Sequence, residues 1–67
     1  MDSDLIGLVG QLTVSIPADG GPGEVVLNIR GGTEAFAAWA DEPIPKYTVV
    51  AVVDQRSARS VTVTPMP

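Results

Sequence analysis

The nucleophilic side chains of this sequence are hydroxyls, and a single amine is available to activate them. The serines are Ser3, Ser15, Ser57 and Ser60, and the amine is Lys46. A serine paired with a lysine can carry out acyl transfer when the lysine is desolvated and within hydrogen-bond reach of the hydroxyl. Lys46 follows Pro45 in a segment typical of a turn, where a solvated, protonated lysine is expected. We therefore predict no enzymatic activity.

Cofactor and metal chemistry find equally little support. The glycine-rich run at 18–23 invites comparison with a phosphate-binding loop, but it lacks the Walker spacing and no helix-forming stretch follows it. The adjacent acids Asp41 and Glu42 are typical of a solvated loop rather than of acid–base catalysis. Cysteine and histidine are both absent, which removes the usual zinc ligands. No metal and no cofactor are predicted.

Binding of single-stranded nucleic acid is a second class of function to weigh. Such sites stack bases on aromatic side chains within a basic groove, and Trp39 beside Lys46 and Arg30 would be the minimal platform here. A formal charge of −4, from four basic and eight acidic residues, disfavours the contacts with phosphate on which affinity largely rests. A tryptophan in so small a domain is also commonly required for packing. No nucleic-acid partner is predicted, and an oligonucleotide-binding domain is kept as the alternative.

Apolar residues at outward positions point instead to contact with another protein. The predicted interaction surface consists of Val26, Trp39, Val49, Ala51 and Val53. An exposed apolar patch on a charged domain often marks a partner or oligomer surface, although loops or terminal segments can also cover such residues. Unpaired strand edges offer a second route, by strand addition, and self-association stays open.

The elements that carry these residues are predicted to be β-strands. Strict alternation places Leu12, Val14 and Ile16 on one face of a strand at 11–16, and the same period of two recurs at 24–30. Strands at 48–54 and 60–64 are rich in valine and threonine, whose stiff χ1 rotamers favour strands over helices. Val50 and Val52 share one face, and Val61 and Val63 are expected inward. Because Val49, Ala51 and Val53 on the other face are also apolar, the strand at 48–54 is predicted to be buried on both sides.

Turns and one ambiguous segment complete the expected order. Gly31-Gly32 is predicted to form a two-residue type I′ hairpin turn, and 54–59 a polar hairpin loop that leaves Arg56 and Arg59 in solvent. The alanine-rich segment 33–40 could form a capped helix, but it is short and stands directly behind a turn, so a strand is favoured. Phe36 and Trp39 would then lie on opposite faces, with one of them in the core.

Length limits the architecture to one small domain. A flexible N-terminal segment is expected at 1–7, a single domain at 8–65, and a tail at 66–67. No apolar run reaches the ~20 residues that cross a bilayer, and the acidic start does not suit a signal peptide, so the chain itself is expected to be soluble. Five short strands predict an all-β fold, a five-stranded Greek-key barrel of the OB (oligonucleotide/oligosaccharide-binding) type, with an SH3-like barrel as the alternative.

The order of several short motifs resembles the C-terminal soluble domain of the NfeD-like membrane proteins, from about Leu8 to Pro65. The motifs are Gly7-x-x-Gly10, Gly21-Pro22-Gly23-Glu24-Val25, Gly31-Gly32, Ile44-Pro45 and Thr48-Val49-Val50-Ala51-Val52-Val53. Two departures stand out: Tyr47 replaces a glycine common in that family, and Val49 and Ala51 replace residues that are often polar.

The resemblance implies an OB-fold domain on the cytoplasmic side of a membrane, carried by transmembrane helices outside this chain. It further implies a role beside membrane partners of the SPFH class, which are stomatin- or flotillin-like proteins. Longer relatives add a ClpP-like serine protease region, and nothing in this sequence matches that region. The predicted function is therefore that of a scaffold or interaction module.

Overall fold

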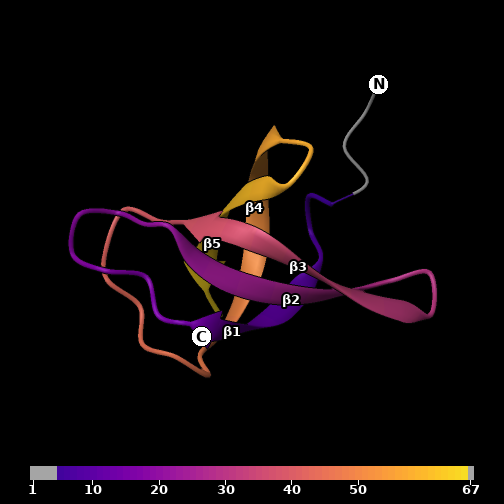
Figure 1. Ribbon diagram of the computed structural model, residues 1–67, viewed down its shortest axis with the longest axis horizontal. Coiled ribbons are helices and arrows are strands. Elements are labelled where there is room, and N and C mark those ends of the chain that lie inside the picture. The colour runs from indigo at the N-terminus through magenta and orange to yellow at the C-terminus, as the bar shows by residue number, and fades with distance from the viewer. Residues whose placement is uncertain (1–4, 67) are drawn as a thin grey trace.

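The computed structural model describes residues 5–66, which form five strands and the segments that connect them (Figure 1). The strands are β1 (Val9–Val14), β2 (Gly23–Ile29), β3 (Gly32–Trp39), β4 (Val49–Ser57) and β5 (Ser60–Pro65). Residues 1–4 of the predicted N-terminal segment and Pro67 of the predicted tail lie outside the described residues. The all-β prediction is confirmed.

The strands close into a barrel in the order β1-β2-β3-β5-β4, and β4 returns to pair with β1. All neighbours are antiparallel except β3 and β5, which run parallel. Closure removes the free sheet edges that a small domain would otherwise expose. This Greek-key order with one parallel pair is that of an OB barrel and excludes the SH3-like alternative.

Inward-facing side chains of all five strands fill the barrel. The buried members include Val50 and Val52 of β4 and Val61 and Val63 of β5, as their alternation predicted. Leu5, from the segment expected to be flexible, is also buried and belongs to this cluster. The full core is Leu5, Leu12, Ile16, Val25, Leu27, Phe36, Ala38, Ile44, Val50, Val52, Val61 and Val63.

β3 resolves the ambiguous segment in favour of a strand. Val25 of β2 pairs with Phe36, which is buried, and Trp39 pairs with Thr62 of β5. Phe36 therefore points inward, while Trp39 points outward and is half-buried, on the opposite face as predicted. The tertiary pairing with β2 and β5 overrides the high helix propensity of the alanines.

The prediction that Val14 faces the core is wrong. The register between β1 and β2 shifts between Leu12 and Val14, which leaves Val14 49% exposed. A bulge of this kind turns the following side chains to the other face. Ile16 is still buried because, beyond the strand, it forms a bridge with Ile44.

The β2–β3 turn lies one residue earlier than predicted. Ile29 pairs with Gly32, so the two turn residues are Arg30 and Gly31 rather than Gly31 and Gly32. Both have positive φ, 53° and 81°, as a type I′ turn requires. Gly32 instead begins β3.

Tyr47 lies in a backbone conformation that favours glycine, the residue that the family resemblance leads us to expect there. Its φ of 75° lies in the left-handed region, which residues with a Cβ rarely occupy. The Tyr47 N–H donates to the carbonyl of Leu12 at 2.9 Å, and Gln11 Nε2 donates to the Tyr47 carbonyl at 3.0 Å. These bonds hold the turn in the conformation that a glycine would take without strain.

β4 differs from its prediction at both its end and its outer face. It continues to Ser57, so most of the segment expected to be a loop is strand, and the β4–β5 hairpin projects from the barrel (Figure 1). Val49 and Val53 are 46% and 50% exposed, so the expectation that this strand is buried on both sides is wrong. A one-layer barrel covers only the inner face of each strand.

Candidate interaction surface

Outward side chains of β1 and β4 form an apolar surface, which we call the β1–β4 patch. Val9 pairs with Ala51, and Val49 and Val53 lie two residues to either side of Ala51 on the same face. Val9, Val49 and Val53 are each about half exposed, and Ala51 between them is partly covered. Three valines on two adjacent strands thus present their side chains to solvent around Ala51.

Both ends of the described chain extend this patch. The Gly7 N–H donates to the Val52 carbonyl at 2.9 Å, and the Met66 N–H donates to the Val49 carbonyl at 3.0 Å. These bonds place Ile6 near the middle of β4 and Met66 beside its first residue, and both side chains are exposed. The β1–β4 patch therefore comprises Ile6, Val9, Val49, Ala51, Val53 and Met66, which include five of the seven large hydrophobic residues exposed between residues 5 and 66.

The structure brings together three of the five predicted surface residues. Val49, Ala51 and Val53 lie in the patch, whereas Val26 is half-buried on β2 and Gln11 of β1 stands between it and Val49. Trp39 is separated from β4 by β5. Val9, Ile6 and Met66 were missed, because no short sequence pattern shows that β1 and β4 are neighbours.

Trp39 is packed between two other parts of the chain. The Arg56 guanidinium carbon lies 4.5 Å from the centroid of the indole ring. The Gly21 backbone is so close that a Cβ there would lie 3.0 Å from the Trp39 Cε3 atom. Arg56 is exposed, as predicted, but the contact of its guanidinium with the indole was not foreseen. The indole therefore offers little free face on which a base could stack.

The other parts of the expected aromatic platform lie elsewhere. Arg30 sits in the turn before β3, whereas Trp39 is the last residue of that eight-residue strand. Lys46 lies 5.0 Å above the ring of Tyr47. A basic groove around Trp39 is thus not assembled from these residues.

Arg56→Ala is expected to lower the free energy of unfolding by about 0.5–1 kcal/mol, because an exposed cation–π contact is worth about that much. Trp39 is the only tryptophan, so the same variant should shift the emission maximum of the native protein. Chemical unfolding followed by tryptophan fluorescence measures both effects. Lys46→Ala, which removes a cation from Tyr47 instead, should leave the Trp39 emission unchanged. Equal effects of the two variants would contradict the contact.

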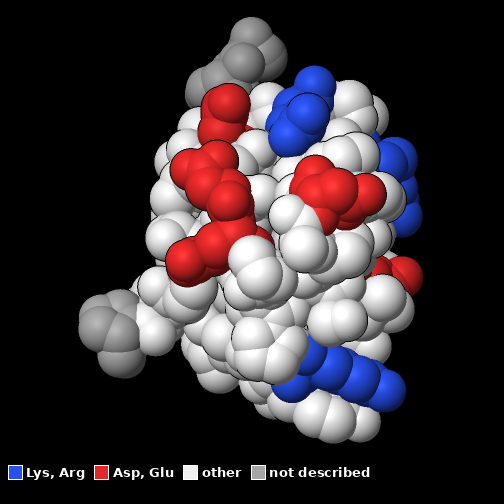
Figure 2. Space-filling model, turned by 90° about the vertical axis from the view of Figure 1, so that its left-hand side faces the viewer, with Lys and Arg blue, Asp and Glu red and all other residues white. Residues whose placement is uncertain are grey.

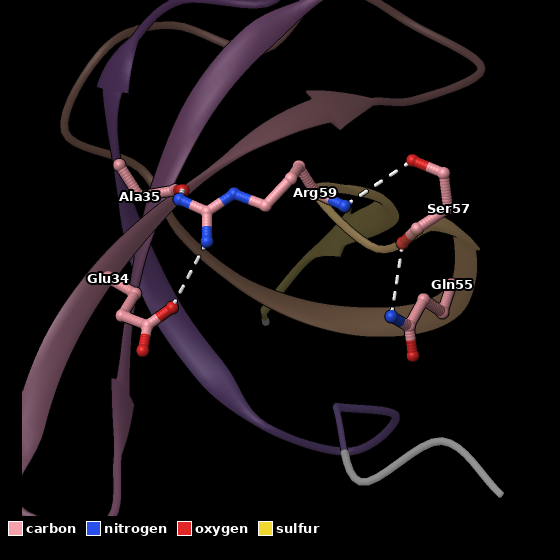
Figure 3. A network of polar contacts seen from close by, with 5 residues as sticks. All are labelled: Glu34, Ala35, Gln55, Ser57 and Arg59. Carbon is pink, nitrogen blue, oxygen red and sulfur yellow. Dashed lines mark hydrogen bonds and ion pairs between the residues drawn. The ribbon is translucent and has the colours of Figure 1, made fainter. Parts of the chain in front are cut away.

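Arg59 holds the β4–β5 hairpin against β3 (Figure 3). Its guanidinium makes an ion pair with Glu34 at 3.3 Å, donates to the Ala35 carbonyl at 3.3 Å, and lies 5.3 Å from the centroid of the Phe36 ring. Arg59 is exposed, as predicted, but its three contacts with β3 were not foreseen. Because both charged groups are largely exposed, the ion pair itself adds little stability, and the contact serves mainly to position the hairpin.

A groove of about 450 Å³ adjoins the β1–β4 patch beside β4 and β5. Asp41 and Glu42 reach it from the connection between β3 and β4, and Val53 belongs both to the groove and to the patch. Its lining residues are Ala40, Asp41, Glu42, Val53, Thr62, Val63, Thr64 and Pro65. Figure 2 looks onto the side of the molecule that carries this connection and shows acidic side chains grouped on it.

The acids of the groove have no cation beside them. Within residues 5–66 the one ion pair joins Arg59 to Glu34, and neither Asp41 nor Glu42 takes part in a hydrogen bond through its side chain. In the same described range, no group of three or more histidine, cysteine, aspartate or glutamate residues could hold a metal ion. The groove therefore presents two uncompensated carboxylates next to an apolar surface.

The hydroxyl groups weighed for catalysis are engaged elsewhere or are dispersed. Ser57 Oγ and Ser60 Oγ lie 2.8 Å apart beside the turn of the β4–β5 hairpin, and Ser3 lies outside the described residues. Over the part of the chain that the structure covers, no hydrogen bond joins Lys46 to a serine. The same part contains no helix long and apolar enough to cross a bilayer.

Comparison with known proteins relates the chain to one family. The model of the NfeD C-terminal domain matches residues 9–64. The solution structure of the soluble domain of the NfeD protein YuaF from Bacillus subtilis superposes with a TM-score of 0.77 at 36% identity, covering 92% of this chain and 74% of that one. No curated protein matches.

A second solved structure shares the fold at lower identity. It is the C-terminal domain of stomatin operon partner protein 1510-C from Pyrococcus horikoshii, with a TM-score of 0.68, 24% identity, and coverage of 96% of this chain and 91% of that one. At this identity the likeness concerns the barrel alone. The family match, which extends from β1 to β5, shows that this chain belongs to the NfeD C-terminal domain family.

Proposed function

We propose that this chain is a non-enzymatic interaction module, the soluble domain of an NfeD-like membrane protein that scaffolds or regulates an SPFH partner. In this proposal the parent protein is anchored by transmembrane helices outside this sequence, and the domain works on the cytoplasmic side. Membership of the NfeD C-terminal domain family supports the parent. The name of the Pyrococcus protein, a stomatin operon partner, supports the class of partner.

The observation that carries the proposal is the exposure of three valines on adjacent strands. Val9, Val49 and Val53 each leave about half of the side chain in water, where a single-domain protein gains nothing from them. Burying such a surface against a partner gains free energy in proportion to the apolar area covered. The carboxylates beside it favour a correctly oriented partner over nonspecific apolar contacts.

The double substitution Val49→Ser with Val53→Ser is expected to weaken binding to an SPFH protein of the same organism by about tenfold or more. Each valine contributes roughly 1 kcal/mol of apolar burial at such an interface. Isothermal titration with the purified SPFH protein measures the change.

The matched control for this test is Val14→Ser, because Val14 is equally exposed but lies outside the β1–β4 patch. It should bind like the original chain, and all variants should keep the original thermal midpoint. If Val14→Ser weakened binding as much as the double variant, or if no SPFH protein bound, the proposal would be wrong. Steeply salt-dependent binding of labelled single-stranded DNA would favour the oligonucleotide-binding alternative instead.

A further inference from the structure

We infer that the acidic groove beside β4 and β5 binds a lysine or arginine side chain of the protein that docks on the β1–β4 patch. This inference rests on the proposed function and adds to it the chemistry that the partner must present. The predicted partner segment carries an apolar residue for the patch and, next to it, a basic residue for the groove.

The shared wall of the two features supports this arrangement. Val53 lines the groove and also stands in the patch, so a segment lying on the patch passes directly over the mouth of the groove. A long basic side chain buries an apolar stem while it keeps its charged head in a polar environment. Val53 and Pro65 can contact such a stem, and Asp41 and Glu42 can accept hydrogen bonds from its head.

The charges of the groove are available for an external cation. Of the four basic residues of the chain, Arg56 stacks on Trp39, Arg59 pairs with Glu34, Lys46 lies over Tyr47, and Arg30 sits in the distant β2–β3 turn. Hydrogen bonds between a charged donor and a carboxylate are about twice as strong as neutral ones. An incoming guanidinium or ammonium group would therefore meet the carboxylates of Asp41 and Glu42, and no existing ion pair would have to break.

The same charges disfavour the other occupants of the patch. A second copy of this chain would bring its own formal charge of −4, and self-repulsion would oppose the contact. Phosphate groups of nucleic acid or of an anionic membrane would face Asp41 and Glu42 across the groove. A basic and apolar segment of a protein is the occupant whose charge complements this surface.

The test is a titration of the isotope-labelled chain with a synthetic peptide of alternating valine and arginine, followed by NMR. The amide signals of the groove, from Ala40 to Glu42, at Val53 and from Thr62 to Pro65, are expected to move. A peptide with citrulline in place of arginine keeps the shape and loses the charge, so its affinity should fall by about tenfold. The double variant Asp41→Asn with Glu42→Gln should lower affinity for the arginine peptide by a similar factor.

The matched control compares single neutralisations: Glu42→Gln in the groove should lower the affinity, whereas Glu24→Gln on β2 removes one charge away from the groove and keeps an oxygen to accept the hydrogen bond from Thr13. General attraction between distant exposed charges is screened by salt, so Glu24→Gln should stay within about twofold of the original chain. Equal losses in Glu42→Gln and Glu24→Gln would overturn the inference, as would peptide signals confined to β2 and β3 or a stable dimer that buries the patch.

Failure of this inference is distinguishable from failure of the proposed function. If the SPFH protein bound through Val49 and Val53 but ignored the Asp41→Asn, Glu42→Gln change, the groove assignment would be overturned and the interaction module would stand. If the arginine peptide occupied the groove while no SPFH protein bound, the partner class would be wrong and the chemistry of the groove would stand.

Discussion

Val52→Asp is expected to abolish the folded state. Val52 is 2% exposed and pairs with Val63 inside the barrel, so an aspartate there would bury an unpaired carboxylate. That penalty amounts to several kcal/mol, whereas a domain of this length has a total stability of roughly 3–10 kcal/mol. Far-ultraviolet circular dichroism during heating should show no cooperative transition.

The adjacent residue provides the control for this variant. Val53 is 50% exposed on the outer face, so Val53→Asp should keep a cooperative transition near the original midpoint. An aspartate is thus expected to unfold the domain at position 52 and to be tolerated at position 53. A native midpoint for Val52→Asp would contradict the facing of β4 and, with it, the outward position of the patch valines.

Gly10→Ala is expected to cost about 3 kcal/mol of stability, an effect at the upper end of those caused by overpacking. A Cβ at this position would lie 2.3 Å from the Val26 carbonyl oxygen and 2.7 Å from Leu27 Cδ2. The first neighbour is backbone in a paired strand, so relief requires β1 and β2 to move apart. Equilibrium unfolding in urea measures the loss.

Gly32→Ala is the matched control for Gly10→Ala. Gly32 also lies in a strand, but its nearest neighbour would be 3.8 Å from an added Cβ, an ordinary contact distance. Its stability should change by no more than about 0.5 kcal/mol. Similar losses at both positions would mean that the close approach of β1 to β2 is not what requires Gly10.

The period of two in the sequence was enough to predict most strands and their inward faces. The prediction succeeded where turn or loop residues mark both ends of a strand, as for β2 and β5. It also succeeded where inward valines alternate without interruption, as at Val50 and Val52. It failed at Val14, because a bulge interrupts the alternation and leaves no local signal. The β2–β3 turn was predicted one residue too late, because Arg30, an unusual residue at positive φ, takes the first turn position.

The candidate surface was harder to predict than the fold, because it depends on which strands are neighbours. Alternation places Val49, Ala51 and Val53 on one face of β4, but only the closure of the barrel brings Val9 beside them. The same limit applies to Arg56, which reaches Trp39 across β5, and to Asp41 and Glu42, which reach the groove from a loop. Contacts between residues distant in the sequence are fixed by the barrel topology and have no periodic signature.

The most direct test of the β1–β4 patch as a contact surface is NMR mapping of the unmodified, isotope-labelled chain bound to the SPFH protein. The account predicts that the amide signals of Val9, Val49, Ala51 and Val53 move or broaden, while those around Val14 and Val26 stay in place. Changes centred on the outer face of β2 and β3 around Val26 and Ala35, with β1 and β4 unaffected, would contradict it.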